Sequence, residues 1–284
     1  MLIGLVGAGA MGSALGAAWR AAGHEVMTDL SGRSARTVDL ARSHGITPVG
    51  SFRDVIGADL VVSIVPPAAA IVVAHDIVRT AMEVGAAPLV ADLNAVSPGT
   101  VAAVADLLHG GGLDLVDGTV SGTPPRPGAR TTLYLSGERA GELSALSSSW
   151  YRTVILDGGV GSASALKMAT SSMYKGTNAL VLQAALTASH FGVLDAFLED
   201  VSGTWPDSVP RWPWEVALAA SKSERFVDEM REIAATQAQA GLVKDLFLGV
   251  AAVFERLSHA DLARVTPEAV PREISFPEIA ERFA

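Results

Sequence analysis

Residues 2–12 read Leu-Ile-Gly-Leu-Val-Gly-Ala-Gly-Ala-Met-Gly, and this stretch decides the fold. The apolar run at 2–6 predicts a buried β-strand, and the Ala-rich run at 11–22 predicts the helix that follows it. A glycine-rich turn between a strand and a helix is the setting in which the G-x-G-x-x-G pattern binds dinucleotides.

Each position in this turn has a physical task. Gly7 permits the tight turn, Gly9 lets the backbone approach a pyrophosphate, and Gly12 lets the helix pack closely on the strand. Ala10 and Met11 begin the helix, where backbone N–H groups without helical partners attract an anion. The stretch therefore predicts a cofactor-binding βα unit, and the alternative is a purely structural turn.

The first half of the chain repeats the same alternation. Short apolar runs are separated by Ala-rich helical stretches, which is typical of a parallel sheet covered by helices on both faces. The unbroken apolar run at 60–65 fits a strand that is buried on both sides. We expect strands at 2–6, 25–28, 60–65, 88–91, 113–116 and 132–135, and helices at 11–22, 34–44, 69–82 and 98–108.

The second half reads as helical. Residues 162–194 contain no proline and could form one helix of about 30 residues, nearly 50 Å long at about 1.5 Å per residue. Ser221 and Glu224 form a plausible capping box that opens a helix toward residue 238, and 242–257 is a further apolar helix. The proline- and tryptophan-rich residues 205–214 predict a loop.

These patterns give an α/β fold class with two domains. We expect a doubly wound Rossmann sheet at 1–160, followed by an all-α domain at 161–284 that serves substrate binding and dimerisation. The glycine-rich residues 157–162 suit the junction, and the long helix that follows would link the domains.

Composition excludes several classes of protein. The chain has 284 residues, 49% of them hydrophobic and 18% charged, which favours a packed globule over a disordered protein. Its net charge of −9 argues against binding nucleic acid. It contains no cysteine, so disulfides, thiolate metal sites and cysteine nucleophiles are excluded, no metal site is predicted, and the expected compartment is the cytoplasm. The uncharged residues 1–19 are interrupted by five glycines and lack a basic start, so we expect no membrane segment.

The end of the second strand bears on the choice of cofactor. Asp29 lies where a carboxylate would hold a ribose diol, as in NAD-binding proteins. Ser31, Arg33, Ser34 and Arg36 follow it and could surround a 2′-phosphate. We therefore favour NADP(H) over NAD(H), with a solvated basic turn as the alternative.

A polar stripe runs along the predicted long helix. Lys167, Ser171, Tyr174 and Asn178 recur at helical spacing on an otherwise apolar helix, with Lys175 slightly to one side. Lysine in such a setting suits acid–base chemistry, because burial tunes its proton affinity. The alternative for Lys167 alone is a lysine that reaches solvent from the helix start.

Five segments, taken in order, resemble the β-hydroxyacid dehydrogenase superfamily. The likeness covers almost the whole chain and is greatest to the 6-phosphogluconate-dehydrogenase-like branch with a distinct C-terminal domain. The segments are the glycine motif, Asp-Leu-Asn-Ala-Val-Ser-Pro at 92–98, Asp-Gly-Thr-Val-Ser-Gly at 117–122, Gly-Gly-Val-Gly-Ser-Ala-Ser-Ala-Leu-Lys at 158–167 and Leu-Val-Lys-Asp-Leu at 242–246.

The resemblance implies a role for each matching residue. Lys167 would be the general acid and base, while Ser121 and Gly122 would hold a substrate carboxylate. Ser171 and Tyr174, from the polar stripe, are further catalytic candidates. Lys244 would reach toward cofactor and substrate from the helical domain, through which family members dimerise. The nicotinamide side would be lined by Val65, Pro66 and Asn94.

The chain also departs from the family pattern. Family dehydrogenases carry an asparagine three or four residues after the lysine, where this chain has Thr170 and Ser171. The loop after Gly122 adds Arg126 and Arg130, which could bind a further anionic group or lie in solvent. A standard hydroxyisobutyrate or phosphogluconate substrate is therefore not expected.

The predicted function is an oxidoreductase that uses NADP(H) to transfer hydride to or from a small carbonyl or hydroxy compound, with a carboxylate on the substrate. An imine reductase on the same fold is the main alternative. Those relatives usually carry Asp or Tyr in place of the lysine, and Tyr174 keeps that possibility open. A non-enzymatic NADP-binding sensor is the third alternative.

Overall fold

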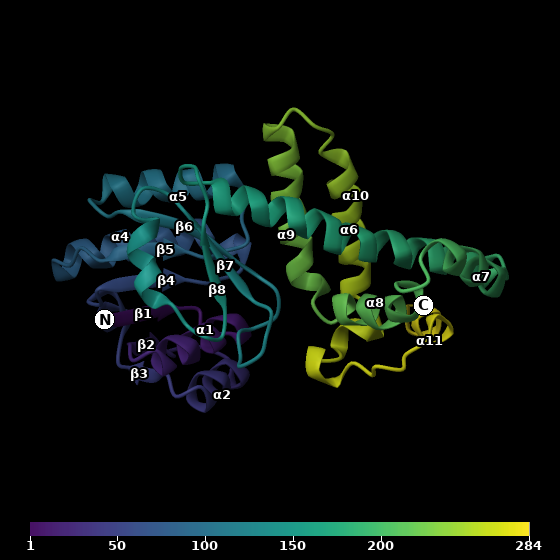
Figure 1. The fold of residues 1–284 in the computed structure, drawn as a ribbon, viewed down its shortest axis with the longest axis horizontal. Helices are drawn as coiled ribbons and strands as arrows, with labels where there is room; N and C mark the ends of the chain where they lie inside the picture. Colours follow the sequence, from purple (N-terminus) through teal and green to yellow (C-terminus); the bar gives the residue numbers. More distant parts are fainter. Residues whose placement is uncertain (284) are drawn as a thin grey trace. The chain divides into compact units, whose positions relative to one another are not determined.

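The computed structural model describes residues 1–283 and divides into two compact units. The first unit is Met1–Met168 and the second begins at Ala169. The division falls within one long helix, α6 (Ser162–His190), which begins just after the expected junction at residue 160 (Figure 1). No helix among residues 1–283 is long and apolar enough to cross a membrane.

An eight-stranded sheet forms the centre of the first unit, in the order β3-β2-β1-β4-β5-β6-β7-β8. Neighbouring strands are parallel except β6 and β7, which run in opposite directions. The strands are β1 (Leu2–Val6), β2 (Glu25–Asp29), β3 (Thr47–Val49), β4 (Leu60–Ser63), β5 (Leu89–Asp92), β6 (Leu115–Ser121), β7 (Thr132–Ser136) and β8 (Arg152–Ile155).

Helices cover both faces of this sheet, as the alternating pattern predicts (Figure 1). One core joins the sheet to α1 through residues such as Leu15 and Trp19. The other core joins the opposite face to α4 and α5 through residues such as Ile77 and Val104. The helices of this unit are α1 (Ala10–Ala21), α2 (Ala35–Ser43), α3 (Phe52–Ile56), α4 (Ala70–Val84) and α5 (Pro98–Gly110), with short 3₁₀ turns at Pro67–Ala69 and Ala140–Leu146.

The expected Rossmann-type sheet is confirmed, and the unit contains three short elements that the sequence did not predict. The sequence pattern missed β3, α3 and β8, which are only three to five residues long. Strand β3 contains Pro48 and strand β8 is partly exposed, so neither has the continuous apolar run of a buried strand. The sheet departs from the expected parallel arrangement at one place, where β7 runs antiparallel to β6.

The second unit is helical, as expected. Helices α9 and α10 pack against each other, and the rings of Phe226 and Phe254 meet edge to face at 5.3 Å between centroids. Beyond α6 the helices are α7 (Leu194–Thr204), α8 (Trp212–Ala220), α9 (Ser223–Gln239), α10 (Asp245–Ser258) and α11 (Phe276–Phe283), with 3₁₀ turns at Val209–Arg211, Asp261–Arg264 and Pro267–Ala269.

Three expectations for this unit differ from the structure. The predicted loop at 205–214 contains a 3₁₀ turn and the start of α8, because Pro213 falls in the first helical turn, where a missing N–H costs nothing. Ser221 does not cap α9: its hydroxyl donates to the Leu218 carbonyl, and α9 begins at Ser223. The long helix ends at His190, before Gly192 in the left-handed region.

Candidate active site

The glycine turn between β1 and α1 has the shape that its motif predicts. Gly7 has φ +100°, and a Cβ there would lie 2.1 Å from the Ile64 carbonyl oxygen. A Cβ on Gly12 would lie 2.1 Å from the Gly7 carbonyl oxygen, so helix and strand need glycine at both positions. A Cβ added to Gly9, by contrast, would have no neighbouring atom within 4 Å, which leaves the backbone open to a ligand.

The start of α1 suits an anion. Its first turn, which begins with Ala10 and Met11, contains no acidic residue. Backbone N–H groups in a first turn lack helical partners and carry the positive end of the helix dipole. The residues present therefore fit the pyrophosphate of a dinucleotide.

The turn after β2 leaves its polar side chains exposed. The Asp29 carboxylate accepts from the Ser31 backbone N–H at 2.8 Å, which orders the turn. Ser34 is the N-cap of α2, since its hydroxyl accepts from the Thr37 N–H at 3.3 Å. Ser31, Arg33 and Ser34 are all exposed, so their polar groups are accessible to a ligand.

Asn94 holds the ends of β4 and β5 together. Its amide oxygen accepts from the Val65 N–H at 2.6 Å, and its amide nitrogen donates to Asp92 at 2.8 Å and to Ser63 at 3.2 Å. The side chain is 1% exposed and these bonds engage both ends of the amide. Asn94 therefore braces the turn that presents Val65 and the exposed Pro66, and a direct cofactor contact of Asn94 stays a prediction.

Asp92 lies in the same buried network. Burial raises the pKa of its carboxyl to about 7, and the negative charge of Asp117 adds to this rise. Hydrogen bonds from the Asn94 backbone and side chain act in the opposite direction. The buried Asp92 carboxyl group, at the end of β5, therefore gains or loses its proton near neutral pH.

Asp117 anchors the start of the long helix, a role that the sequence reasoning missed. Its buried carboxylate lies on β6 and accepts five hydrogen bonds, from β7, from Gly161 just before α6 and from the first turn of α6. The donors are the Ser136 hydroxyl at 2.9 Å, the backbone N–H groups of Gly161, Ala163 and Ser164 at 2.8, 3.0 and 3.2 Å, and the Ser164 hydroxyl at 2.7 Å.

This anchor sets the position of Lys167, which lies one turn along α6. The Lys167 ammonium group donates to the Val120 carbonyl at 2.8 Å, immediately before Ser121. Gly122 follows with φ +105°, and a Cβ on it would lie 2.6 Å from the Arg130 carbonyl oxygen. The first unit thus brings together three predicted site residues, Lys167, Ser121 and Gly122.

The second unit contains a buried ion pair that the sequence reasoning also missed. The Lys175 ammonium group contacts the Glu229 carboxylate, whose side chain is 5% exposed, and lies 4.7 Å from the Phe226 ring centroid. Arg225 pairs with the same carboxylate at 3.0 Å. Burial lowers the pKa of Lys175, while the charge and hydrogen bond of Glu229 oppose that shift. Lys175 lies to one side of the predicted stripe, and no local signal marks Glu229 as its partner.

The remaining predicted site residues belong to this second unit. Ser171 is buried and accepts a hydrogen bond from Lys175 at 3.5 Å. Tyr174 is 72% exposed, and Lys244 is exposed immediately before α10. Their roles toward the cofactor-binding unit stay predictions.

Two family profiles match the chain. Residues 2–144, about half of the chain, match the NAD binding domain of 6-phosphogluconate dehydrogenase. The chain belongs to this family. Residues 188–257 match the domain of unknown function DUF1932, which agrees with the expected distinct C-terminal domain. The resemblance inferred from the five segments is thereby confirmed.

Solved structures share the fold over nearly the full length. The conserved protein MTH1747 of unknown function, reported to resemble 3-hydroxyacid dehydrogenases, is 27% identical with a TM-score of 0.66, covering 91% of this chain and 97% of its own. A 3-hydroxyisobutyrate dehydrogenase from Salmonella typhimurium is 20% identical with a TM-score of 0.68, over 95% and 98%. An imine reductase variant from Myxococcus stipitatus in complex with NAD⁺ is 21% identical with a TM-score of 0.56, over 100% and 98%. The last two show a common fold only.

Proposed function

We propose that this protein is an NADP(H)-dependent oxidoreductase that acts on a small carbonyl or hydroxy compound bearing a carboxylate. The observation that carries the proposal is the Lys167 ammonium group, 2.8 Å from the Val120 carbonyl and beside the Ser121–Gly122 turn. The proposed proton donor and the turn proposed to hold the carboxylate therefore belong to the unit that also contains the glycine-rich turn between β1 and α1.

The nicotinamide, when bound, supplies or accepts the hydride at the substrate carbon. The Ser121 hydroxyl and the Gly122 N–H would hold the substrate carboxylate and orient the reacting carbon. In reduction Lys167 gives a proton to the carbonyl oxygen, and in oxidation it takes the proton of the hydroxyl group. Asp117 keeps Lys167 in place by fixing the first turn of its helix.

The preference for NADP(H) is supported by the turn after β2. The Asp29 carboxylate already accepts from its own turn, and the exposed Ser31, Arg33 and Ser34 offer hydroxyl and guanidinium donors. A 2′-phosphate would be recognised by such donors.

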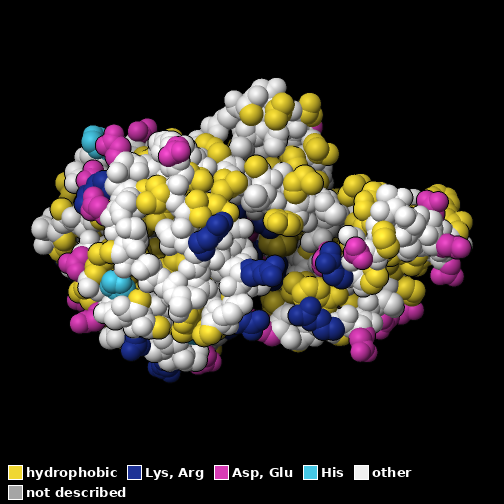
Figure 2. Space-filling view, viewed as in Figure 1, with side chains coloured by type: hydrophobic (Ala, Val, Ile, Leu, Met, Phe, Trp, Pro, Cys, Tyr) yellow, Lys and Arg dark blue, Asp and Glu magenta, His cyan; other side chains and the backbone are white. Residues whose placement is uncertain are grey.

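The roles predicted from the sequence for Ser171, Tyr174 and Lys244 belong to this proposal, and a homodimer would form through the helical unit. Support comes from apolar side chains at the end of the α9–α10 pair, where yellow groups gather at the surface in Figure 2. Leu242, Val243 and Leu246 are 59%, 73% and 63% exposed there. Covering such a patch favours association.

An imine substrate is the second candidate. The exposed Tyr174 phenol favours it, because a tyrosine can supply the proton that C=N reduction needs. A carbonyl substrate is preferred because Lys167 lies beside the carboxylate-binding turn.

The test is titration of the wild type and Lys167→Met with NADPH and NADH by fluorescence, followed by turnover on β-keto acids, aldehydes and cyclic imines. We expect the variant to bind NADPH within about twofold of wild type and to lose about 10²–10⁴-fold in turnover. Ser172→Ala is the matched control, since its hydroxyl donates to the Ala169 carbonyl of its own helix. Full carbonyl turnover by Lys167→Met would refute the proposed role, and turnover of imines alone would favour the second candidate.

A further inference from the structure

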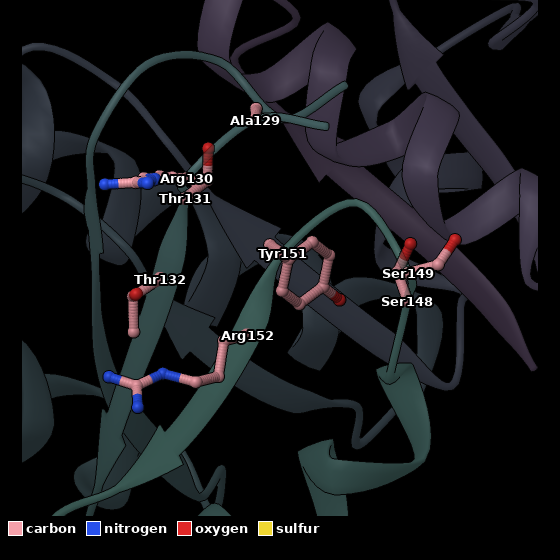
Figure 3. A pocket seen from close by; sticks show the side chains of 8 residues that line it. All are labelled: Ala129, Arg130, Thr131, Thr132, Ser148, Ser149, Tyr151 and Arg152. Carbon is pink, nitrogen blue, oxygen red and sulfur yellow. The ribbon is translucent and has the colours of Figure 1, made fainter. Parts of the chain in front are cut away.

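An open hollow of about 550 Å³ lies in the first unit, outside the site described above. Figure 3 shows it between the end of the loop that follows β6 and the segment that leads into β8. None of the residues that line it is acidic. They are Ala129, Arg130, Thr131, Thr132, Ser148, Ser149, Tyr151 and Arg152.

Strand register places this hollow at the edge of the sheet that carries the proposed site. Thr132 pairs with Ser121 on one side and with Arg152 on the other. Neighbouring strands are about 4.8 Å apart, so the Cα atoms of Ser121 and Arg152 are separated by about 10 Å. This is the edge at which open α/β sheets bind their ligands.

Two arginines in the hollow have no acidic partner. Arg130 and Arg152 are exposed, and neither forms an ion pair within residues 1–283. In Figure 3 their guanidinium groups extend to the same side, with the Thr132 side chain between them. In a chain with a net charge of −9, two adjacent unpaired arginines are a marked local excess of positive charge.

Hydrogen bonds fix the backbone at Arg130 and Arg152. The Thr131 hydroxyl donates to the Thr123 carbonyl at 2.8 Å and closes the loop that ends at Arg130. The Arg152 N–H donates to the Thr131 carbonyl at 2.9 Å, which ties β8 to the same point. The Tyr151 hydroxyl is held by Trp19 and the Leu146 carbonyl, so its ring is fixed against the hollow. Binding here would therefore cost little ordering of the backbone.

We propose that Arg130, Arg152 and Thr132 form a phosphate-binding site that takes a phosphate monoester. A phosphoryl group presents three oxygens, which two guanidinium forks and one hydroxyl can satisfy together. The phosphate is carried either by the distal end of the substrate, a source that rests on the proposed function, or by a separate small ligand. Arg130 lines the hollow, whereas Arg126, which lies on the same loop, does not and is therefore not part of the proposed site.

The first experiment measures binding without any turnover. Inorganic phosphate is titrated by calorimetry into wild type, the Arg130→Gln/Arg152→Gln double variant and the Arg126→Gln control. We expect the double variant to bind phosphate at least tenfold more weakly and the control to stay within about twofold of wild type. Because both substituted arginines are exposed and unpaired, melting temperatures should be unchanged. Equal phosphate affinity in wild type and the double variant, or equal losses in the control, would overturn the site.

The second experiment separates the two sources of the phosphate. Once a carbonyl substrate is found, kcat/KM is compared for that substrate with and without a terminal phosphate. A selective loss for the phosphorylated compound in the double variant supports binding of the substrate's distal end. Equal kcat/KM values together with intact phosphate binding in wild type support a separate ligand. Failure of all turnover would refute the proposed function and leave the phosphate titration as an independent result.

Discussion

Replacing Asp117 tests how the long helix is anchored. Asp117→Ala removes the acceptor of five hydrogen bonds in a site with 0% exposure. A hydrogen bond to a charged group contributes about 1.5–3 kcal/mol net to stability, but these five bonds share one carboxylate and their contributions do not add. Each buried donor left without an acceptor costs about 1–3 kcal/mol, and some of the donors can turn to other acceptors, so we expect a total loss of about 3–5 kcal/mol.

Asp117→Asn sharpens the test. Its amide oxygen can replace Oδ2, which accepts four of the five bonds, and the Ser164 hydroxyl can turn to accept from the new amide nitrogen. Only the charge is lost, so we expect about 1–2 kcal/mol. Asp114→Ala is the matched control, because its surface pair with Arg139 contributes at most about 1 kcal/mol.

The assay combines urea unfolding with amide hydrogen exchange. In Asp117→Ala the amides of Ala163 and Ser164 should exchange much faster, while NADPH affinity stays near wild type and turnover falls with the loss of Lys167 positioning. A stability loss below about 1 kcal/mol, or unchanged exchange at these amides, would refute the anchoring role. Equal stability losses in the asparagine and alanine variants would contradict it as well.

Three further predictions concern other parts of the molecule. Gly7→Ala should lower the melting temperature because of its 2.1 Å clash, whereas Gly9→Ala should melt normally and bind NADPH poorly; matching behaviour in both assays would contradict this. The pKa of Asp92 is higher in the folded protein than in the unfolded chain, so folding favours the protonated form. The contribution of Asp92 to the free energy of unfolding is therefore complete below about pH 4 and is lost as the pH rises toward 7. Asp92→Asn should therefore gain stability over wild type across that range, by at most about 4 kcal/mol, and a pH-independent difference in urea midpoints would count against it. Lys175→Met should lower the free energy of unfolding by about 3 kcal/mol, because the buried Glu229 carboxylate loses the positive charge of Lys175. Adding Glu229→Leu should restore most of this stability, and a double variant no more stable than Lys175→Met in urea unfolding would contradict the prediction.

The parts of the site that could be predicted from sequence are local. The glycine turn is marked by three glycines within six residues, a pattern that can be recognised without knowing that the carbonyl group facing Gly7 belongs to Ile64. Lys167 was found by helical spacing and by its resemblance to a family segment, and its contact with the Ser121–Gly122 region agrees with that order of segments.

The parts that could not be predicted depend on contacts between distant residues. The Asp117 anchor joins residues at least 44 positions apart along the chain in its bonds to α6, and the Lys175–Glu229 pair spans 54. No periodicity encodes which carboxylate will meet which donor, because that depends on packing of whole elements. The direction of β7 was missed for a related reason: its apolar pattern is the same in parallel and antiparallel pairing.

The closed loop between β6 and β7 has a consequence for evolution. Its ends are fixed by strand pairing between Ser121 and Thr132 and by the hydroxyl of Thr131, which bonds to the Thr123 carbonyl. Substitutions at the exposed positions Arg126 and Arg130 can therefore change the charge presented at this edge without disturbing the sheet. Related chains could acquire new substrate preferences through this short segment alone, while the glycine turn at 7–12 and Lys167 stay unchanged.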